Sequence, residues 1–168
     1  MFIQVQEVLN RREPLELQGS LDLSDVFRDS RDMQPLGPLN WRLTANHVER
    51  TITLAGELNC PMRMHCSRCL DSIDETVTLS FEERFRLVRA GDPSPDEDDD
   101  YVPLKEDAID LDAFLTEEFV VQLPLVPLCK DDCLGLCPSC GTNRNEQPCA
   151  CSNERIDPRL EALQNWFK

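Results

Sequence analysis

The segment TITLAGELNCPMRMHCSRCLDSIDETVTLSFEERFRL, residues 51–87, carries the clearest structural signal in the chain. Apolar and polar residues alternate along both of its halves, a pattern typical of half-buried antiparallel strands. The halves are joined by HCSRCL, residues 65–70. The sequence therefore predicts a long β-hairpin with a C-x-x-C pair at its tip. Gly56 and Pro61 predict a bend, a bulge or an edge position in the first strand.

The flanking sequence predicts an α+β protein. Shorter strand candidates upstream complete an antiparallel β-sheet over residues 1–89, which includes the long hairpin. Residues 90–108 have the composition of an acidic linker. The remaining residues, 109–168, should form a helix over about 111–123, a Cys-rich zinc-knuckle module and a short C-terminal helix that begins near Asp157 and Pro158.

The nine cysteines are mostly paired at metal-ligand spacings. Cys137-Pro-Ser-Cys140-Gly141 is the strongest local signal, since its turn directs backbone N–H groups at thiolates and Gly accepts a positive φ. The pair Cys149 and Cys151 follows closely enough to complete the same site. The two expected sites are Cys66, Cys69, Cys129 and Cys133 (site 1) and Cys137, Cys140, Cys149 and Cys151 (site 2). One or two zinc ions are the expected cofactor, and Cys60 is expected to be a buried thiol.

Other uses of these residues are less favoured. Redox C-x-x-C pairs stand at helix N-termini, whereas these lie in turns and in Pro- and Gly-containing loops. A catalytic zinc needs an open coordination position, and four thiols are available at each site.

His47 and His65 show no metalloprotease spacing, although His65 adjoins Cys66. The run from Asp96 to Asp100 lacks the spaced ligands of a calcium loop. The chain contains no phosphate loop or dinucleotide fingerprint.

Charge and targeting features indicate a cytoplasmic protein with a basic partner. The net charge is −15, and residues 92–112 contribute −9 of it, from ten acids and one lysine. The N-terminus lacks signal-peptide features, and no stretch approaches the roughly 20 apolar residues of a membrane span. Such an acidic surface disfavours nonspecific binding to phosphate backbones. The candidate residues for contact with RNA or a partner are Arg63, Arg68, Arg84 and Arg86, and the plain alternative is an exposed strand face with internal ion pairs.

Three segments resemble the YceD family, the bacterial and plastid proteins of large-subunit (23S) ribosomal RNA accumulation. They are HCSRCLDSIDETVTLSFEERFRL (65–87), IDLDAFLTEEFVVQLPLVPLCKDDCLGLCPSCGTNRNEQPCAC (109–151) and DPRLEAL (157–163). Family members with a reduced C-terminal tail keep counterparts of Cys66, Cys69 and the 129–133 region. The resemblance thus supports site 1 and makes site 2 an addition. It implies a role in 23S ribosomal RNA synthesis, processing or stability, and it does not imply an enzyme.

Three functional hypotheses follow from the residues and the resemblance together. The first is a non-enzymatic, zinc-stabilised biogenesis factor whose direct contact is a basic ribosomal protein or assembly factor. The second is a zinc-ribbon module that binds RNA directly, with the 23S precursor as the ligand. The third is a thiol redox sensor.

Overall fold

The structure is a computed structural model that describes residues 1–88 and 100–151 of the 168-residue chain. Its internal contacts divide the chain into two units. The sheet unit comprises Met1–Met64 and Ile73–Leu125, and the cysteine unit comprises His65–Ser72 and the chain from Val126 onward.

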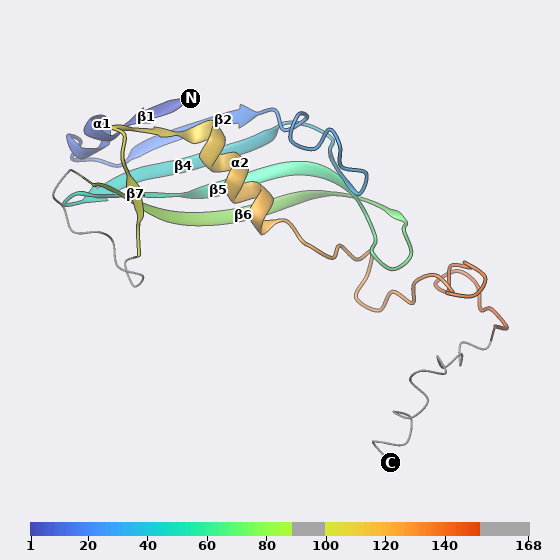
Figure 1. Cartoon of the computed structure of the whole chain (residues 1–168). Coiled ribbons are helices and arrows are strands. Elements are labelled where there is room, and N and C mark those ends of the chain that lie inside the picture. Colours follow the sequence, from blue (N-terminus) through green and yellow to red (C-terminus); the bar gives the residue numbers. More distant parts are fainter. Residues whose placement is uncertain (89–99, 152–168) are drawn as a thin grey trace, which may run out of the picture. The chain divides into compact units, whose positions relative to one another are not determined.

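The sheet unit is a mixed α+β fold, which confirms the predicted class. In chain order its elements are β1 (Phe2–Gln4), α1 (Val5–Leu9), β2 (Leu15–Leu21), β3 (Met33–Pro35), β4 (Leu39–Val48), β5 (Thr51–His65), β6 (Ser72–Leu87), β7 (Val102–Leu104), β8 (Ala108–Asp110) and α2 (Leu111–Gln122). The main sheet has the order β2-β4-β5-β6-β7 with β3 beside β5, while β1 pairs with β8 (Figure 1). β4 is antiparallel to both β2 and β5, whereas the short β7 is parallel to β6.

The strands β5 and β6 are neighbours in this sheet. The side chain of Arg63 donates a hydrogen bond to Asp74, and Asn59 accepts a hydrogen bond of 2.8 Å from Thr78. Arg63 follows Asn59 along β5, whereas its partner Asp74 precedes Thr78 along β6, so the two strands run in opposite directions. Residues 66–71 connect the two strands, so this connection carries the first cysteine pair.

Alternation along the strands produces one buried face. The buried residues are Leu39, Trp41, Leu43 and Ala45 in β4, and Ile52, Leu54, Leu58, Cys60, Met62 and Met64 in β5. Because successive side chains of a strand point to opposite faces, these residues all project to the same side of the sheet. Figure 1 shows α2 lying across the sheet. Phe114 of this helix packs edge-on against Phe81 and Phe85 of β6, with ring centroids 5.5 and 5.2 Å apart.

The predicted helix over residues 111–123 is confirmed as α2. Leu111, Leu115 and Phe119 recur every four residues and are fully buried, so they form the face that meets the sheet core. Asp110 caps the helix by accepting hydrogen bonds from the backbone N–H groups of Asp112 and Ala113. Among the described residues, no helix combines the length and apolar character needed to cross a membrane.

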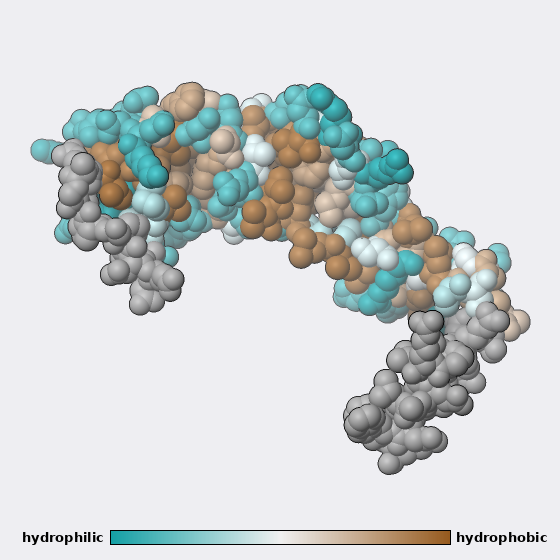
Figure 2. Space-filling model, in the orientation of Figure 1, coloured by the Kyte–Doolittle hydropathy of each residue, from teal (hydrophilic) through white to brown (hydrophobic). Residues whose placement is uncertain are grey.

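The other sides of α2 are less covered. Figure 2 shows hydrophobic residues gathered over α2 and the chain just after it, while much of the visible face of the sheet unit is hydrophilic. Val121 is 75% exposed and Leu125 is 94% exposed. These side chains contribute nothing to the core and leave apolar surface at the end of the helix.

Gly56 explains an interruption in the buried register of β5. It occupies the position between Leu54 and Leu58 at which a third core side chain would stand. A Cβ there would lie 2.3 Å from the carbonyl oxygen of Arg42 and 2.8 Å from the Cα of Leu43. Both of these atoms belong to the backbone of β4, so a side chain could fit only if the two strands moved apart. Glycine thus permits a close approach between β5 and β4.

Pro61 stands where β5 changes partners. The pairing of β5 with β4 ends at Asn59, and its pairing with β3 begins at Met62. Proline cannot donate a backbone hydrogen bond, and the gap between two partner strands tolerates that loss. The sequence predicts a bend, a bulge or an edge position here, whereas β5 is an interior strand and Pro61 falls between its two partners.

The acidic region differs from the prediction of a continuous linker. Residues 89–99 lie outside the described part of the chain, but Val102–Leu104 forms β7 and Ala108–Asp110 forms β8. Ile109 is buried and Leu104 packs against the core. The segment as a whole has an acidic composition. Its few apolar residues nevertheless belong to the strands β7 and β8.

The unit boundaries also differ from the expected division into residues 1–89, 90–108 and 109–168. The helix α2 belongs to the sheet unit because its apolar face is buried in the sheet core. The connection between β5 and β6 is grouped instead with the second half of the chain. The expected C-terminal helix near Asp157 lies outside the described residues.

Candidate metal centres

Four thiols of site 1 converge within the cysteine unit. Cys66 and Cys69 come from the connection between β5 and β6, and Cys129 and Cys133 come from the chain after α2. All four sulfur atoms lie within 4.8 Å of one another. The Cys66–Cys133 and Cys69–Cys129 sulfur pairs are 3.8 and 3.5 Å apart. Tetrahedral zinc with bonds of about 2.3 Å separates its sulfur ligands by about 3.8 Å, so the group could hold such an ion.

The thiols of site 2 form a second group of the same kind. The sulfur atoms of Cys137, Cys140, Cys149 and Cys151 also lie within 4.8 Å of one another. Cys137 is buried, whereas Cys140 and Cys151 are exposed. The structure thus assembles the same two sets of four that the spacing predicts, and their role as metal ligands stays a prediction.

The two C-x-x-C turns share one backbone design. In the first turn the N–H of Leu70 donates to the carbonyl of Cys66 at 2.9 Å, and in the second the N–H of Gly141 donates to that of Cys137 at 2.8 Å. Leu70 and Gly141 both have positive φ, 63° and 74°. The amides of Cys66 and Cys137 close the turns by donating to Asp71 and Thr142, each five residues ahead. Equal geometry in two separate segments indicates a common chemical role.

The backbone in these turns favours thiolates. Burial raises the pKa of Cys66, but backbone hydrogen bonds from Cys129, Cys69 and Arg68 outweigh it and lower this pKa to about 6. Backbone hydrogen bonds from Cys140 and Ser139 lower the pKa of Cys137 to about 6 as well. Because metal ions bind the thiolate form, the first cysteine of each turn is prepared for coordination.

The cysteine unit lacks an aliphatic core of its own. Among its described residues, no Leu, Ile, Val, Met or Phe is buried, whereas Cys66, Cys69, Cys133 and Cys137 are. Leu70, Val126 and Leu134 are all more than half exposed. The interior of this unit therefore consists mainly of its potential ligands. Small domains of this kind obtain their stability from a bound metal or from cross-links.

Cys60 lies apart from both groups. It is fully buried in the core of the sheet unit, with its sulfur 3.6 Å from the carbonyl oxygen of Gly37. Burial raises its pKa, so the thiol form is favoured. This confirms the prediction that Cys60 acts as a small apolar side chain. Neither His47 nor His65 belongs to a metal-ligand group found in the described residues.

Two of the four candidate arginines are engaged in ion pairs on the sheet. Arg63 forms a two-pronged pair with Asp74 at 2.6 and 2.7 Å. Arg84 pairs with Asp100 at 2.8 Å and with Glu82 at 3.5 Å. These pairs offset the basic charge that an RNA phosphate would contact.

The other two arginines also have partners. Arg86 stacks on the ring of Tyr101, 5.3 Å from the ring centroid. Arg68 lies between the first cysteine pair and donates to the backbone carbonyls of Cys133 at 2.9 Å and Asp131 at 3.3 Å. It thereby ties the first C-x-x-C turn to the second pair of site 1.

Two asparagines were not foreseen from the sequence. Asn143 and Asn145 lie in the loop between Cys140 and Cys149, and the side chain of Asn145 donates to the sulfur of Cys133 at 3.3 Å. Burial raises the pKa of the Cys133 thiol, but this hydrogen bond, together with one from the Gly135 backbone, contributes to a net lowering. The only signal in the sequence is a pair of amides two residues apart, which is too common to be diagnostic.

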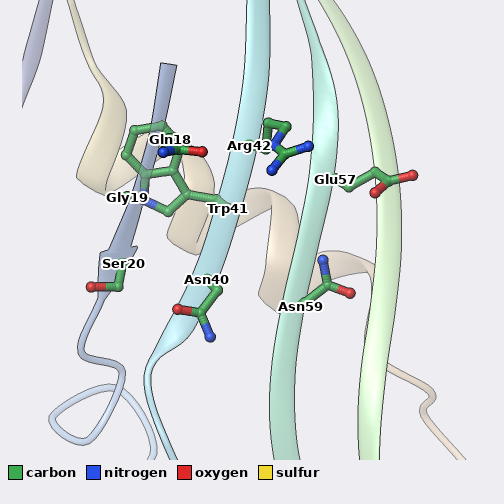
Figure 3. A pocket seen from close by; sticks show the side chains of 8 residues that line it. All are labelled: Gln18, Gly19, Ser20, Asn40, Trp41, Arg42, Glu57 and Asn59. Carbon is green, nitrogen blue, oxygen red and sulfur yellow. The ribbon is translucent and has the colours of Figure 1, made fainter. Parts of the chain in front are cut away.

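An open hollow of about 630 Å³ lies on the sheet (Figure 3). Most of its lining residues are polar, and they come from β2, β4 and β5. Trp41 is an exception, because its side chain belongs to the buried core face. Trp41 borders the hollow because Gly19 on the adjacent strand leaves room for the indole ring, which stands where a Cβ of Gly19 would clash at 2.6 Å. Arg42 and Glu57 are its charged residues, and it holds no thiol or histidine. The hollow has no evident catalytic constellation.

Comparison with known proteins assigns this α+β chain, with its two tetracysteine groups, to a family. The family model described as "Large ribosomal RNA subunit accumulation protein YceD" matches residues 54–166. The chain therefore belongs to the YceD family. The match covers β5 from Leu54 onward, β6, α2 and both cysteine groups.

The individual relatives share less than 30% of their aligned residues with this chain. An uncharacterized protein of Mycobacterium leprae is 29% identical over 121 residues, which cover 72% of this chain and 55% of the relative. The uncharacterized protein YlbN of Bacillus subtilis is 24% identical over 162 residues, 94% of this chain and 90% of the relative. The Arabidopsis thaliana protein named "Large ribosomal RNA subunit accumulation protein YCED homolog 1, chloroplastic" is 22% identical over 168 residues, 83% of this chain and 52% of the relative.

This chain thus spans only a little over half the length of the mycobacterial and plant relatives that it matches. No solved structure matches it significantly.

Two glycines of the cysteine unit provide a matched test of its packing. Gly135 and Gly141 have positive φ of 70° and 74°, so alanine at either position costs roughly 1–2 kcal/mol of backbone strain. A Cβ at Gly135 would also lie 2.9 Å from the carbonyl oxygen of Arg68, whereas one at Gly141 meets nothing within 4 Å. We expect Gly135→Ala to lower the free energy of unfolding by at least about 1 kcal/mol more than Gly141→Ala, measured by urea denaturation. Equal losses would contradict this packing.

Proposed function

We propose that this chain is a non-enzymatic, zinc-stabilised factor in the synthesis, processing or stability of 23S ribosomal RNA, acting in large-subunit biogenesis in the bacterial cytoplasm. The observation that carries the proposal is the family match over residues 54–166, which includes every cysteine of both groups. The name of the Arabidopsis relative refers to the same process.

A structural role for zinc accounts for the composition of the cysteine unit. Soft thiolate ligands favour zinc over magnesium, calcium or manganese. Four cysteines at each site fill a tetrahedral shell and leave no position for a substrate or a reactive water. Since no Leu, Ile, Val, Met or Phe side chain of the described part of this unit is buried, bound metal would supply the stability that a core provides elsewhere.

Charge favours a basic protein as the direct partner. The chain carries −15, and two zinc ions, each with four thiolates, would add −4. A ribosomal protein or an assembly factor with a basic surface complements this charge. Direct binding to the 23S precursor is the alternative, and it would require arginines such as Arg63 and Arg84 to exchange their carboxylate partners for phosphate. A thiol redox sensor is the third candidate, and unchanged metal content after mild peroxide treatment would count against it.

Metal analysis tests the two centres. The purified chain should contain two zinc ions, and the double variant Cys137→Ser/Cys140→Ser should contain one, because serine hydroxyls are poor zinc ligands. Elemental analysis with protein quantification provides the measurement. Cys60→Ala is the control and should keep both ions, since Cys60 lies in the sheet core. Two ions retained in the double variant would refute the assignment of site 2.

The ribosomal role is tested in cells that lack the protein. We expect the ratio of 23S to 16S ribosomal RNA to fall, and the wild-type chain to restore it. Cys66→Ser/Cys69→Ser should fail to restore the ratio because it removes two ligands of site 1, whereas Cys60→Ala should succeed. Quantitative RNA electrophoresis measures the ratio, with protein levels checked by immunoblot. A normal ratio in the absence of the protein would contradict the proposed function.

The nature of the partner is tested by the salt dependence of binding. Immobilised chain should retain basic ribosomal proteins or assembly factors at low ionic strength and lose them as salt rises, because screening weakens charge attraction. Nuclease treatment should not change this retention. Retention that disappears with nuclease, together with weaker RNA binding by Arg63→Ala and Arg84→Ala, would favour direct recognition of RNA.

A further inference from the structure

The loop enclosed by the second cysteine set contacts the first. The side chain of Asn145 donates to the sulfur of Cys133 at 3.3 Å. Its Oδ1 accepts the backbone N–H of Leu134 at 2.9 Å. Because that N–H can only donate, the oxygen of the amide must face Leu134 and the NH₂ group must face the sulfur. Asn145 belongs to site 2 by its place in the sequence, yet it bonds a ligand of site 1.

Asn143 holds Asn145 in this position. Its Oδ1 accepts from the backbone N–H of Asn145 at 3.1 Å and from the Asn145 side chain at 2.9 Å. Its own NH₂ group donates to the carboxylate of Asp71, two residues beyond Cys69, at 3.2 Å. The loop therefore touches the surroundings of both cysteine pairs of site 1.

The backbone around Cys137 fixes the same loop. Leu136 forms a β-bridge with Asn143, and the N–H of Cys137 donates to the carbonyl of Thr142 at 2.8 Å. On its other side, Leu136 donates its N–H to the carbonyl of Arg68 at 3.0 Å. One short segment thus lies between the first C-x-x-C turn and the loop that carries Asn145.

We propose that Asn145 is a positioning residue of site 1 and that it acts there only while site 2 has a metal ion bound. Metal at site 2 therefore raises the zinc affinity of site 1. The inference rests on the proposed binding of zinc at both sites. A zinc ion with four thiolates carries a net charge of −2, and an amide N–H aimed at one sulfur stabilises that charge. Groups that orient and polarise metal ligands typically change the metal affinity by about 10- to 100-fold.

The dependence on site 2 follows from the covalent connections of the loop. Residues 141–148 are bounded by Cys140 on one side and Cys149 on the other, and both are ligands of the same proposed ion. That ion would close the loop into a short ring and restrict the conformations available to Asn143 and Asn145. Without the ion, ordering the loop would cost more conformational entropy, and the hydrogen bond to Cys133 would be less populated.

A double-mutant cycle on the full-length chain tests the proposal. Asn145→Asp keeps the size of the side chain and its acceptor for Leu134, but it replaces the N–H donor with a carboxylate oxygen. Zinc affinities are measured by chelator competition for four chains: wild type, Asn145→Asp, Cys137→Ser/Cys140→Ser and the triple variant. Gln147→Ala is the control, because Gln147 is an exposed amide of the same loop that bonds Asn143 through its backbone N–H, which alanine keeps.

The expected results distinguish loss of the hydrogen bond from Asn145 to Cys133 from a general change in the packing of the loop. Asn145→Asp and Cys137→Ser/Cys140→Ser should each weaken site 1 by about tenfold or more, and Gln147→Ala should not. The triple variant should be no weaker at site 1 than the double variant, because the hydrogen bond has already been lost. With Co²⁺ in place of zinc, Asn145→Asp should also shift the thiolate-to-metal absorption band, a change that loss of packing elsewhere would not cause.

Two further outcomes separate this proposal from the one on which it rests. Wild-type chain that binds two zinc ions, together with unchanged site 1 affinity in Asn145→Asp or in Cys137→Ser/Cys140→Ser, would overturn the coupling alone. Wild-type chain without zinc would overturn the metal centres and the coupling together. Asn145→Ala is a second variant that should reproduce the loss if Asn145→Asp does not fold.

Discussion

The cysteine unit depends on the convergence of four thiols from two distant loops. Cys69 and Cys129 are 60 residues apart, and Cys66 and Cys133 are 67 apart. The length-dependent cost of closing such a loop is about 3–4 kcal/mol. Structural zinc sites in small modules contribute about 10–16 kcal/mol at neutral pH. One coordinated ion would therefore outweigh the closure cost, which the exposed aliphatic residues of this unit do not offset.

The two units are stabilised by different kinds of interaction. The sheet unit buries an alternating set of aliphatic and aromatic strand side chains against α2, whose Leu115 and Phe119 are fully buried. The cysteine unit buries thiols and surrounds them with backbone N–H groups, as at Cys66 and Cys137. Arg68 illustrates the consequence: this candidate for RNA contact instead donates hydrogen bonds to the backbone carbonyls of Cys133 and Asp131.

Much of the sheet unit could be predicted because its determinants are local and periodic. Alternation along residues 51–87 marks the strands β5 and β6, and the four-residue spacing of Leu111, Leu115 and Phe119 marks α2. Strands β7 and β8 were missed because three residues in an acidic context carry no periodic signal. At Gly56 the sequence indicates only an irregularity in the strand, since the cause of the close approach is the backbone of another strand.

The sequence alone determined the neighbouring cysteine pairs, because spacings of one to three residues allow two thiols to reach one ion. The joining of the Cys66 and Cys69 pair with the Cys129 and Cys133 pair follows from the sequence only by elimination. The sequence also determined that Cys60 is excluded, through its place in the apolar register of β5. Only the tertiary structure decided what surrounds those thiols. Asn145 reaches Cys133, and each of the four candidate arginines finds a partner, through contacts between segments that lie apart in the chain. Spacing encodes reach along the backbone, but a hydrogen bond to a sulfur atom depends on the direction in which a folded loop presents its amide.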